Sequence, residues 1–213
     1  EERGSGRTIE QQVYPGFWLT AARNLEWWFE LHVLGQLRAS PTGPLLPQRF
    51  VATGLVMTPA PWFPLLDTSI SLGRLADTQD ERLRPGVRWT TTAKLRPLPA
   101  LELEPTVSTS WLRGDGQRVY DERILNLLAV WHLGPRSHLR AIVQRSQLDR
   151  AAARLDQQQE QSLTWSWRPS TGTVFYVGAS RTRSGVAAAR VSEAFVKLQV
   201  DVDDARAWWR DRS

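Results

Sequence analysis

The chain has 213 residues, 11 Trp, no Cys and a net charge of +5, so it is long enough for one domain with a sizeable core but has neither a disulfide framework nor a thiolate metal site. Its basic residues are spread along the chain, whereas a nucleic-acid-binding face needs them clustered, so we expect no nucleic-acid partner. No run of about 18 apolar residues occurs, which argues against a transmembrane helix.

Residues 1–12 form a polar N-terminal segment, and the first predicted strands follow at 13–22 and 25–37. In the second of these, every other residue from Leu25 is apolar or glycine, and the residues between are largely polar or charged. This period of two is the signature of a β-strand with one apolar face. We assign the β structure to residues 13–200.

The same alternation recurs along the chain and predicts about 10–12 strands in total. Strongly alternating strands are expected at 87–96, 101–111, 124–133, 162–168, 174–180 and 195–200, and weaker ones at 50–58, 66–72 and 139–144. The best helical candidate is 148–159, where Leu148, Ala152 and Leu155 could share a face. Because strands flank this segment, we expect a loop excursion there instead.

The connections between these strands alternate in length. Short ones are expected at 23–24, 58–64, 97–100, 134–137 and 169–172, and long ones at 39–49, 73–85, 113–122, 145–161 and 181–188. This alternation predicts an antiparallel up-and-down sheet whose two ends face different compartments. Transmembrane β-barrels have short turns on the periplasmic side and longer loops outside.

The turn at 97–100 predicts the register of one hairpin. If the chain reverses there, Arg96 faces Glu102 and Lys94 faces Glu104 on the polar side. Leu95 then faces Leu103, and Trp89 faces Thr109, on the apolar side. Opposite charges across a strand pair contribute about 0.2–1 kcal/mol, which favours this register.

Alternation alone does not say whether the apolar side faces a protein core or lipid, since a soluble β-barrel or sandwich has the same period. Two features favour lipid. Strands such as 25–37 and 101–111 are longer than the usual 5–6 residues or so of soluble strands and suit the roughly 9–11 of a tilted membrane strand. Most Trp residues lie near a predicted strand end, where indole suits the headgroup level. We therefore expect an all-β, antiparallel up-and-down transmembrane β-barrel in the outer membrane of a Gram-negative bacterium, in contact with outer-membrane lipid.

This interpretation assigns the two faces of the strands. The polar residues expected to face the lumen are Glu26, Glu30, His32, Arg88, Lys94, Arg96, Glu102, Glu104, Asn126, Arg140 and Gln144. The residues expected to face lipid or its interfaces are Leu25, Trp27, Phe29, Leu31, Trp89, Leu95, Leu103, Trp111, Trp131, Trp165 and Trp167. The mixed charges of the first set predict a polar interior, which could be plugged rather than open.

The first and last predicted strands run in the same direction, because the first precedes a short turn and the last follows a long loop. A single-chain barrel with periplasmic ends needs an even number of strands. We therefore expect this chain to be the C-terminal part of a longer barrel, completed by an upstream domain or by another chain. The alternative is one uncounted strand within 50–72.

Residues 50–200 contain segments that resemble a bacterial outer-membrane family. The matching positions are Arg96, Pro97, Leu101, Leu103 and Pro105 (RP-x-x-x-L-x-L-x-P), then Leu139, Arg140, Ile142 and Gln144 (L-R-x-I-x-Q), and the closing TGTVFYVGASRTR and SEAFVKLQV. In that family a carbohydrate-binding-module-9-like sandwich precedes a C-terminal β-barrel of unknown function. The resemblance implies the barrel fold. The sandwich has no counterpart in these residues, so any sugar binding that it implies has no residues here.

Unlike that family, the chain continues past its last predicted strand as a tail, 201–213. Its Asp203 and Asp204 precede Arg206 and Arg210, a charge order that suits a short helix by its dipole. Trp208 and Trp209 could anchor such a helix at the membrane interface. A disordered tail is the alternative interpretation, and the acidic run at 201–204 lacks the ligand count of a calcium site.

No catalytic or metal-binding motif appears in the sequence, so we expect no cofactor, no metal and no enzymatic activity. The three histidines are His32, His132 and His138, and the Ser–His combinations near them, His132 with Ser137 and His138 with Ser146, are not persuasive as catalytic pairs. The expected role is passage, anchoring or surface binding in a porin-like, tryptophan-rich barrel that serves transport. The alternatives are a soluble β-barrel or sandwich that binds a sugar or apolar ligand through Trp, and an outer-membrane barrel hydrolase.

Overall fold

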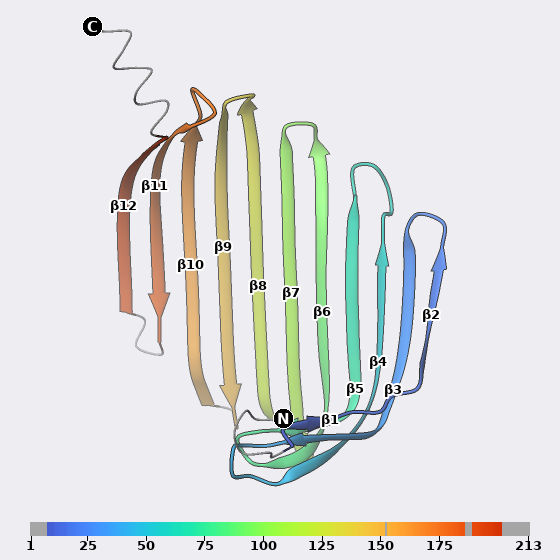
Figure 1. Cartoon of the computed structure of the whole chain (residues 1–213). Helices are drawn as coiled ribbons and strands as arrows, with labels where there is room; N and C mark the ends of the chain where they lie inside the picture. The colour runs from blue at the N-terminus through green and yellow to red at the C-terminus, as the bar shows by residue number, and fades with distance from the viewer. Residues whose placement is uncertain (1–7, 152, 186–188, 202–213) are drawn as a thin grey trace, which may run out of the picture.

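A single antiparallel sheet makes up the fold of this protein (Figure 1). The computed structural model describes residues 8–151, 153–185 and 189–201. From β3 onward each strand pairs with the next along the chain. The strands are β1 (Glu10–Gln11), β2 (Gly16–Ala21), β3 (Leu25–Arg38), β4 (Leu45–Met57), β5 (Leu65–Asp77), β6 (Arg82–Leu98), β7 (Leu101–Gly114), β8 (Gln117–Gly134), β9 (Ser137–Arg150), β10 (Ala153–Trp167), β11 (Thr173–Ser184) and β12 (Ala189–Val200).

The predicted all-β, antiparallel up-and-down architecture is thereby confirmed. The sheet is open, since within the described residues no ladder joins β12 to β1 or β2. None of the described segments is a helix long and apolar enough to cross a membrane. The predicted C-terminal helix lies outside the described residues, apart from Asp201.

β1 and β2 together form one interrupted edge strand beside β3. Glu10 pairs with Leu37 near the end of β3, and Gly16 pairs with Glu30 nearer its start. Between them the Pro15 carbonyl accepts the Leu31 N–H at 2.9 Å. Proline donates no ladder hydrogen bond and is tolerated at a sheet edge. The strand predicted at 13–22 is therefore wrong in its bounds, and the polar segment 1–12 contains β1.

The strands are longer than the sequence pattern predicts, and the connections are correspondingly shorter. β7 ends at Gly114 and β8 begins at Gln117, while β9 ends at Arg150 and β10 begins at Ala153. The long connections predicted at 73–85, 113–122 and 145–161, the last with its loop excursion, are therefore wrong, because most of their residues lie in strands. Residues 39–44 do connect β3 to β4, as the predicted connection at 39–49 requires in part. The turn between β7 and β8 is a two-residue hairpin in which Asp115 and Gly116 have φ of 52° and 79°. Positive φ at both positions matches the twist of the strands.

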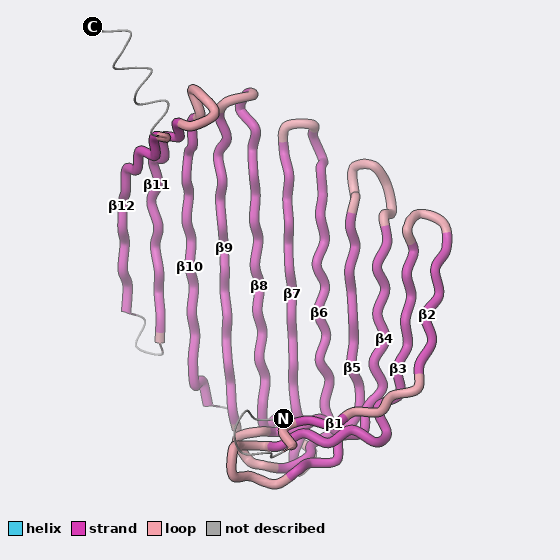
Figure 2. The backbone as a smooth tube through the Cα atoms, in the orientation of Figure 1, coloured by secondary structure: helices cyan, strands magenta, loops and turns pink. Residues whose placement is uncertain are grey.

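Figure 2 shows that the described connections from β2 to β12 lie at the two ends of the sheet, whereas the segment between β1 and β2 runs along its edge. We call the end with the turns at 99–100 and 135–136 the upper end, as drawn, and the other the lower end. β2 and β12, the two edges of the sheet, both run from the lower to the upper end (Figure 1).

The predicted register of the β6–β7 hairpin is confirmed. Leu95 pairs with Leu103 and Trp89 pairs with Thr109. The Lys94 Nζ atom lies 2.6 Å from Glu104 Oε1, and Arg96 Nη2 lies 3.2 Å from Glu102 Oε1. The charged side chains of this hairpin thus share one face of the sheet and its apolar side chains share the other.

Apolar residues form an oblique band on one face, which we call the apolar face. One hydrogen-bonded row is largely apolar from β3 to β8 and polar beyond: Trp27, Leu55, Thr68, Thr91, Val107, Leu125, Arg145, Gln159 and Arg183. A row nearer the upper end is apolar from β7 to β12: Leu101, Trp131, Leu139, Trp165, Val177 and Val196. The band therefore climbs toward the upper end as it passes from β3 to β12.

The opposite face, the polar face, is concave at the lower end. Arg150 on β9 and Asp77 on β5 are four strand spacings apart along the sheet, about 19 Å at the usual strand separation. Their side chains nevertheless meet, with Arg150 Nη2 2.9 Å from Asp77 Oδ1. The sheet must curl for this contact to form, and Figure 1 shows the lower ends of β3 and β4 turning beneath their neighbours.

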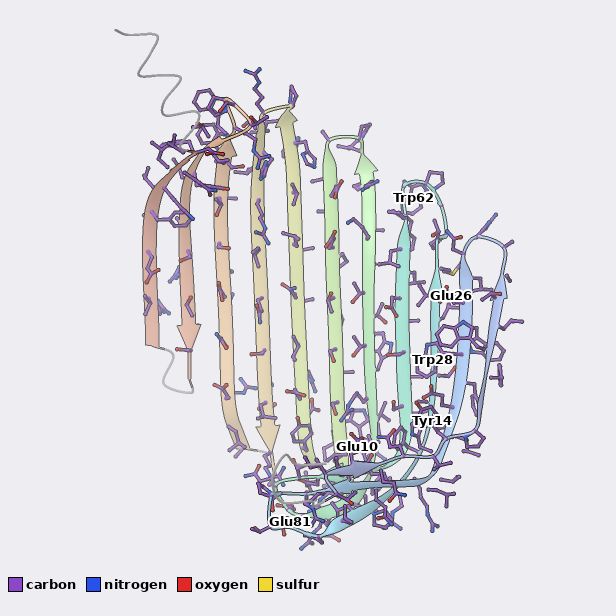
Figure 3. The ribbon with its side chains drawn as sticks, viewed as in Figure 1. Glu10, Tyr14, Glu26, Trp28, Trp62 and Glu81 are labelled. Carbon is purple, nitrogen blue, oxygen red and sulfur yellow. The ribbon has the colours of Figure 1, made fainter. Side chains whose placement is uncertain are left out.

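Trp28 on β3 (Figure 3) covers Gly54 on the neighbouring β4, on the polar face. A Cβ added at Gly54 would collide with the indole ring. We expect Gly54→Ala to lower the free energy of unfolding by about 1–3 kcal/mol, because overpacking forces the ring or the backbone to move. Urea unfolding followed by Trp fluorescence measures this change.

Gly134→Ala is the matched control, because a Cβ there meets nothing within 4 Å. Its free energy of unfolding should change by less than about 0.5 kcal/mol. Equal losses in the two variants would contradict the packing of Trp28 over Gly54.

Candidate functional site

The polar face gathers the residues that the sequence places in a lumen. One row across it contains Glu26, Val56, Asp67, Thr92, Thr106, Asn126 and Gln144, which includes three of the eleven predicted positions. The others lie on the same face, and Arg88, for example, pairs with Ser110 and through it with Glu122. The predicted lipid-facing residues lie on the apolar face. These placements describe faces of the sheet, and the lumen itself stays a prediction.

The Trp residues are not all at strand ends. Trp131, Trp165 and Trp167 lie in the last four residues of β8 and β10, and Trp62 lies in the connection at the upper end (Figure 3). Trp89 is instead in the middle of β6, since β6 extends to Arg82 and is longer than the alternation indicated.

A cluster of ion pairs around the buried Asp77 closes the polar face at the lower end, and we call it the lower cluster: Asp77, Asp80, Arg84 and Arg150. Asp77 has a side chain that is only 2% exposed, and Arg84 Nε lies 2.9 Å from its Oδ2. Arg84 and Arg150 also approach Asp80, at 2.6 and 2.7 Å. Two carboxylates face two guanidinium groups, so the charges of the lower cluster balance.

The lower cluster gives the fold a dependence on pH. The pKa of Asp80 is held below its usual value of 3.8, mainly by a hydrogen bond from Arg84 and to a lesser extent by one from Arg150. A carboxylate with a lowered pKa in the folded state contributes stability above the unfolded value, and that stability is lost as pH falls through the folded pKa. We expect the urea midpoint to fall as the pH drops below 3.8, and Asp80→Asn to flatten this dependence.

Asp156→Asn is the control for this measurement, because Asp156 is exposed on β10. Its stability should follow the wild-type pH profile. A wild-type slope retained in Asp80→Asn would contradict a role for Asp80 in acid sensitivity.

His32 is a packed side chain rather than a solvated one. It is 6% exposed, and its ring stacks between Tyr14 and Phe50 at centroid distances of 4.7 and 4.1 Å. Its Nε2 atom lies 3.0 Å from Glu30 Oε2. The ring therefore fixes the segment between β1 and β2 against the sheet.

Hydroxyl groups occupy the middle of the polar face. Thr90 and Ser108 hydrogen-bond at 3.0 Å, and Thr92 and Thr106 at 3.2 Å, both across the β6–β7 pair. These short polar side chains make the central part of the concave surface wettable without fixed charge.

A cavity of about 460 Å³ opens on the polar face at the upper end, and we call it the upper pocket. Its polar lining includes His132, Arg136, His138, Arg140, Ser162, Thr164, Ser166, Arg168 and Tyr176. It carries basic and hydroxyl groups and no carboxylate.

The upper pocket contains a Ser–His contact that the sequence did not reveal. Ser166 on β10 is 2% exposed, and its Oγ lies 3.0 and 2.8 Å from Nδ1 and Nε2 of His138 on β9. The two are 28 positions apart, and it is the β9–β10 register that pairs them. In a catalytic triad a carboxylate orients the histidine that acts as the base. Within the described residues, no carboxylate contacts His138. The contact therefore fixes both side chains in place.

No model of a known protein family matches this chain, and no curated protein matches it.

Proposed function

We propose that this chain forms part of an outer-membrane β-barrel of a Gram-negative bacterium, with the apolar face toward lipid and the polar face toward an aqueous interior. Its role is passage, anchoring or surface binding without catalysis. The observation that carries this proposal is the pairing of an uncovered apolar face with a concave, charged face on the same strands. On the apolar face Trp131, Leu163 and Leu125 are 51%, 49% and 44% exposed, and no large side chain among the described residues is fully buried.

The oblique course of the apolar band supports the membrane interpretation. Barrel strands tilt by about 35–45° from the membrane normal. A band that stays level in the bilayer must then cross the hydrogen-bonded rows of the sheet. The rows through Trp27 and Val196 show this crossing, because the apolar residues move to higher rows from β3 to β12.

Several polar atoms of the apolar band between β3 and β6 are paired with one another. The indole N–H of Trp27 donates to Thr53 Oγ1 at 2.9 Å, and that of Trp89 donates to Thr68 Oγ1 at 3.1 Å. Thr68 also hydrogen-bonds Thr91, at 2.6 Å between the hydroxyl oxygens. In hydrocarbon no water can satisfy these groups, so internal pairing is what a lipid-facing surface requires.

The open sheet needs partner strands to become a closed barrel. Its two edges run in the same direction, so joining β12 directly to β2 would create a parallel pair. A second copy in the same membrane orientation would meet the same mismatch. We propose that an odd number of further strands, from an upstream domain or another chain, completes an all-antiparallel barrel. We also propose that the chain is related to the outer-membrane barrel family that residues 96–105 and 139–144 resemble.

Detergent dependence tests the membrane proposal. The purified chain should fold only with detergent or lipid, and the folded form should migrate differently from the heated form in a gel. A monodisperse, folded monomer in detergent-free buffer would contradict it and would favour the soluble alternative, in which Trp residues bind a sugar or apolar ligand.

A further inference from the structure

We propose that the upper pocket binds a small organic molecule through a phosphate group. The inference needs only the folded sheet, and it does not rest on membrane insertion.

The charge imbalance of the upper pocket is the first support. Arg136, Arg140 and Arg168 line it, and within the described residues none of these guanidinium groups makes an ion pair. The lower cluster shows the opposite arrangement, in which each guanidinium faces carboxylates. Unpaired positive charge that converges on a cavity is compensated when an anion binds.

The segments that carry these side chains are joined to one another. The backbone N–H of Arg168 donates to the backbone carbonyl of Arg136 at 2.7 Å. The chain after β10 is therefore held against the turn between β8 and β9. Arg140 projects onto the same face from β9, where it pairs with Thr164. The three cationic groups therefore come from backbone that is fixed before any ligand arrives, which lowers the entropy cost of binding.

The floor and wall of the pocket supply the remaining contacts. Ser166 and His138 hold each other at the floor, while the hydroxyl groups of Thr164 and Tyr176 line the cavity. Lys197 Nζ lies 5.9 Å from the centroid of the Tyr176 ring and adds a further cation at this end of the sheet. Apolar side chains such as Ile142 and Val174 also line it and can contact a carbon skeleton.

Phosphate fits this set of groups better than a neutral ligand. The planar guanidinium fork binds two oxygens of a phosphate at once, and hydroxyl groups donate to the third. The volume of about 460 Å³ exceeds what inorganic phosphate needs and lies in the range of small-molecule pockets. A sugar phosphate is a ligand of this size and charge.

Isothermal titration calorimetry of the folded chain tests the proposal, with glucose 6-phosphate, inorganic phosphate and glucose as probes. Glucose 6-phosphate should bind saturably and glucose should not. Arg140→Gln and Arg168→Gln should each weaken binding by about tenfold or more, since each removes one charge-assisted contact. Added salt should also weaken binding.

Arg145→Gln is the matched control. Arg145 lies on β9, as Arg140 does, but its side chain is on the opposite face of the sheet, in the row through Leu125. Its affinity should equal that of the wild type. Circular dichroism and the urea midpoint of each variant establish that it is folded.

The outcomes separate the possible sources of the phosphate. Tighter binding of glucose 6-phosphate than of inorganic phosphate supports an organic phosphate ligand, and equal binding by both contradicts a role for the carbon skeleton. The proposal is overturned if neither phosphate compound binds, if glucose binds equally well, or if folded Arg140→Gln and Arg168→Gln retain wild-type affinity.

Discussion

Replacing Asp77 by Asn should lower the free energy of unfolding by about 3–5 kcal/mol. The Asp77 carboxylate is 2% exposed and faces Arg84 and Arg150, each of which is 13% exposed. Removing its charge leaves two largely buried guanidinium groups that share Asp80 as their remaining carboxylate. An uncompensated buried charge costs far more than the ion pair contributes, which explains the size of the expected effect.

Glu104→Gln is the comparison that isolates burial. Glu104 pairs with Lys94 at a similar distance, but both side chains are about one-third exposed. Exposed pairs contribute less than about 1 kcal/mol, so this variant should unfold near the wild-type urea concentration. Similar losses in Asp77→Asn and Glu104→Gln would contradict the role of the lower cluster as a buried clamp.

Replacing Val107 by Arg distinguishes lipid from water at the apolar face. Val107 is 36% exposed in the row through Leu125. In a bilayer an arginine near the midplane of a barrel strand costs about 2–4 kcal/mol. In a soluble protein the same exposed substitution changes the free energy of unfolding by about 0.5 kcal/mol or less. Unfolding measured in phospholipid vesicles gives the value.

Gln144→Arg introduces the same side chain at nearly the same level but on the polar face, where Gln144 pairs with Asn126 and Glu160. We expect little loss in this control, because the guanidinium would lie in the aqueous interior beside a carboxylate. A small loss in both variants would show that the apolar face is not in contact with hydrocarbon.

The alternation of residues was enough to predict the fold class and the faces of the central strands. At Leu25–Arg38 and Leu101–Gly114 one face is apolar and the other is polar, so a period of two is visible in the sequence. The Pro-containing turn between β6 and β7 fixed the register, since a slip by one residue would exchange the faces. These features depend on neighbours in the chain, which the sequence displays directly.

The lower arms of the hairpins escaped prediction for a physical reason. At the lower ends of β9 and β10 both faces carry polar residues, for example Gln147 and Gln157 on one face and Ser146 and Gln158 on the other. The alternation of hydrophobicity disappears there although the backbone ladder continues. A segment with two polar faces therefore has the sequence signature of a loop and the structure of a strand.

The residues of the candidate site were found only in part. The polar positions of β6 and β7 follow from the alternation of polar and apolar residues. That Arg136, Arg140 and Arg168 line one pocket depends instead on the β9–β10 register and on the turn before Ser137. The contact between Ser166 and His138 has the same origin. The paired rows of the β9–β10 hairpin would have revealed this contact if the turn between Arg150 and Ala153 had been located.

The Asp77–Arg150 contact joins residues 73 positions apart, whereas nearly all other contacts between strands link successive arms of a meander. Each hairpin can form by closing a short loop, but this bridge must wait until both distant arms are in place. Its absence from the transition state would make Asp77 a determinant of how slowly the native state opens, with little influence on how fast it assembles.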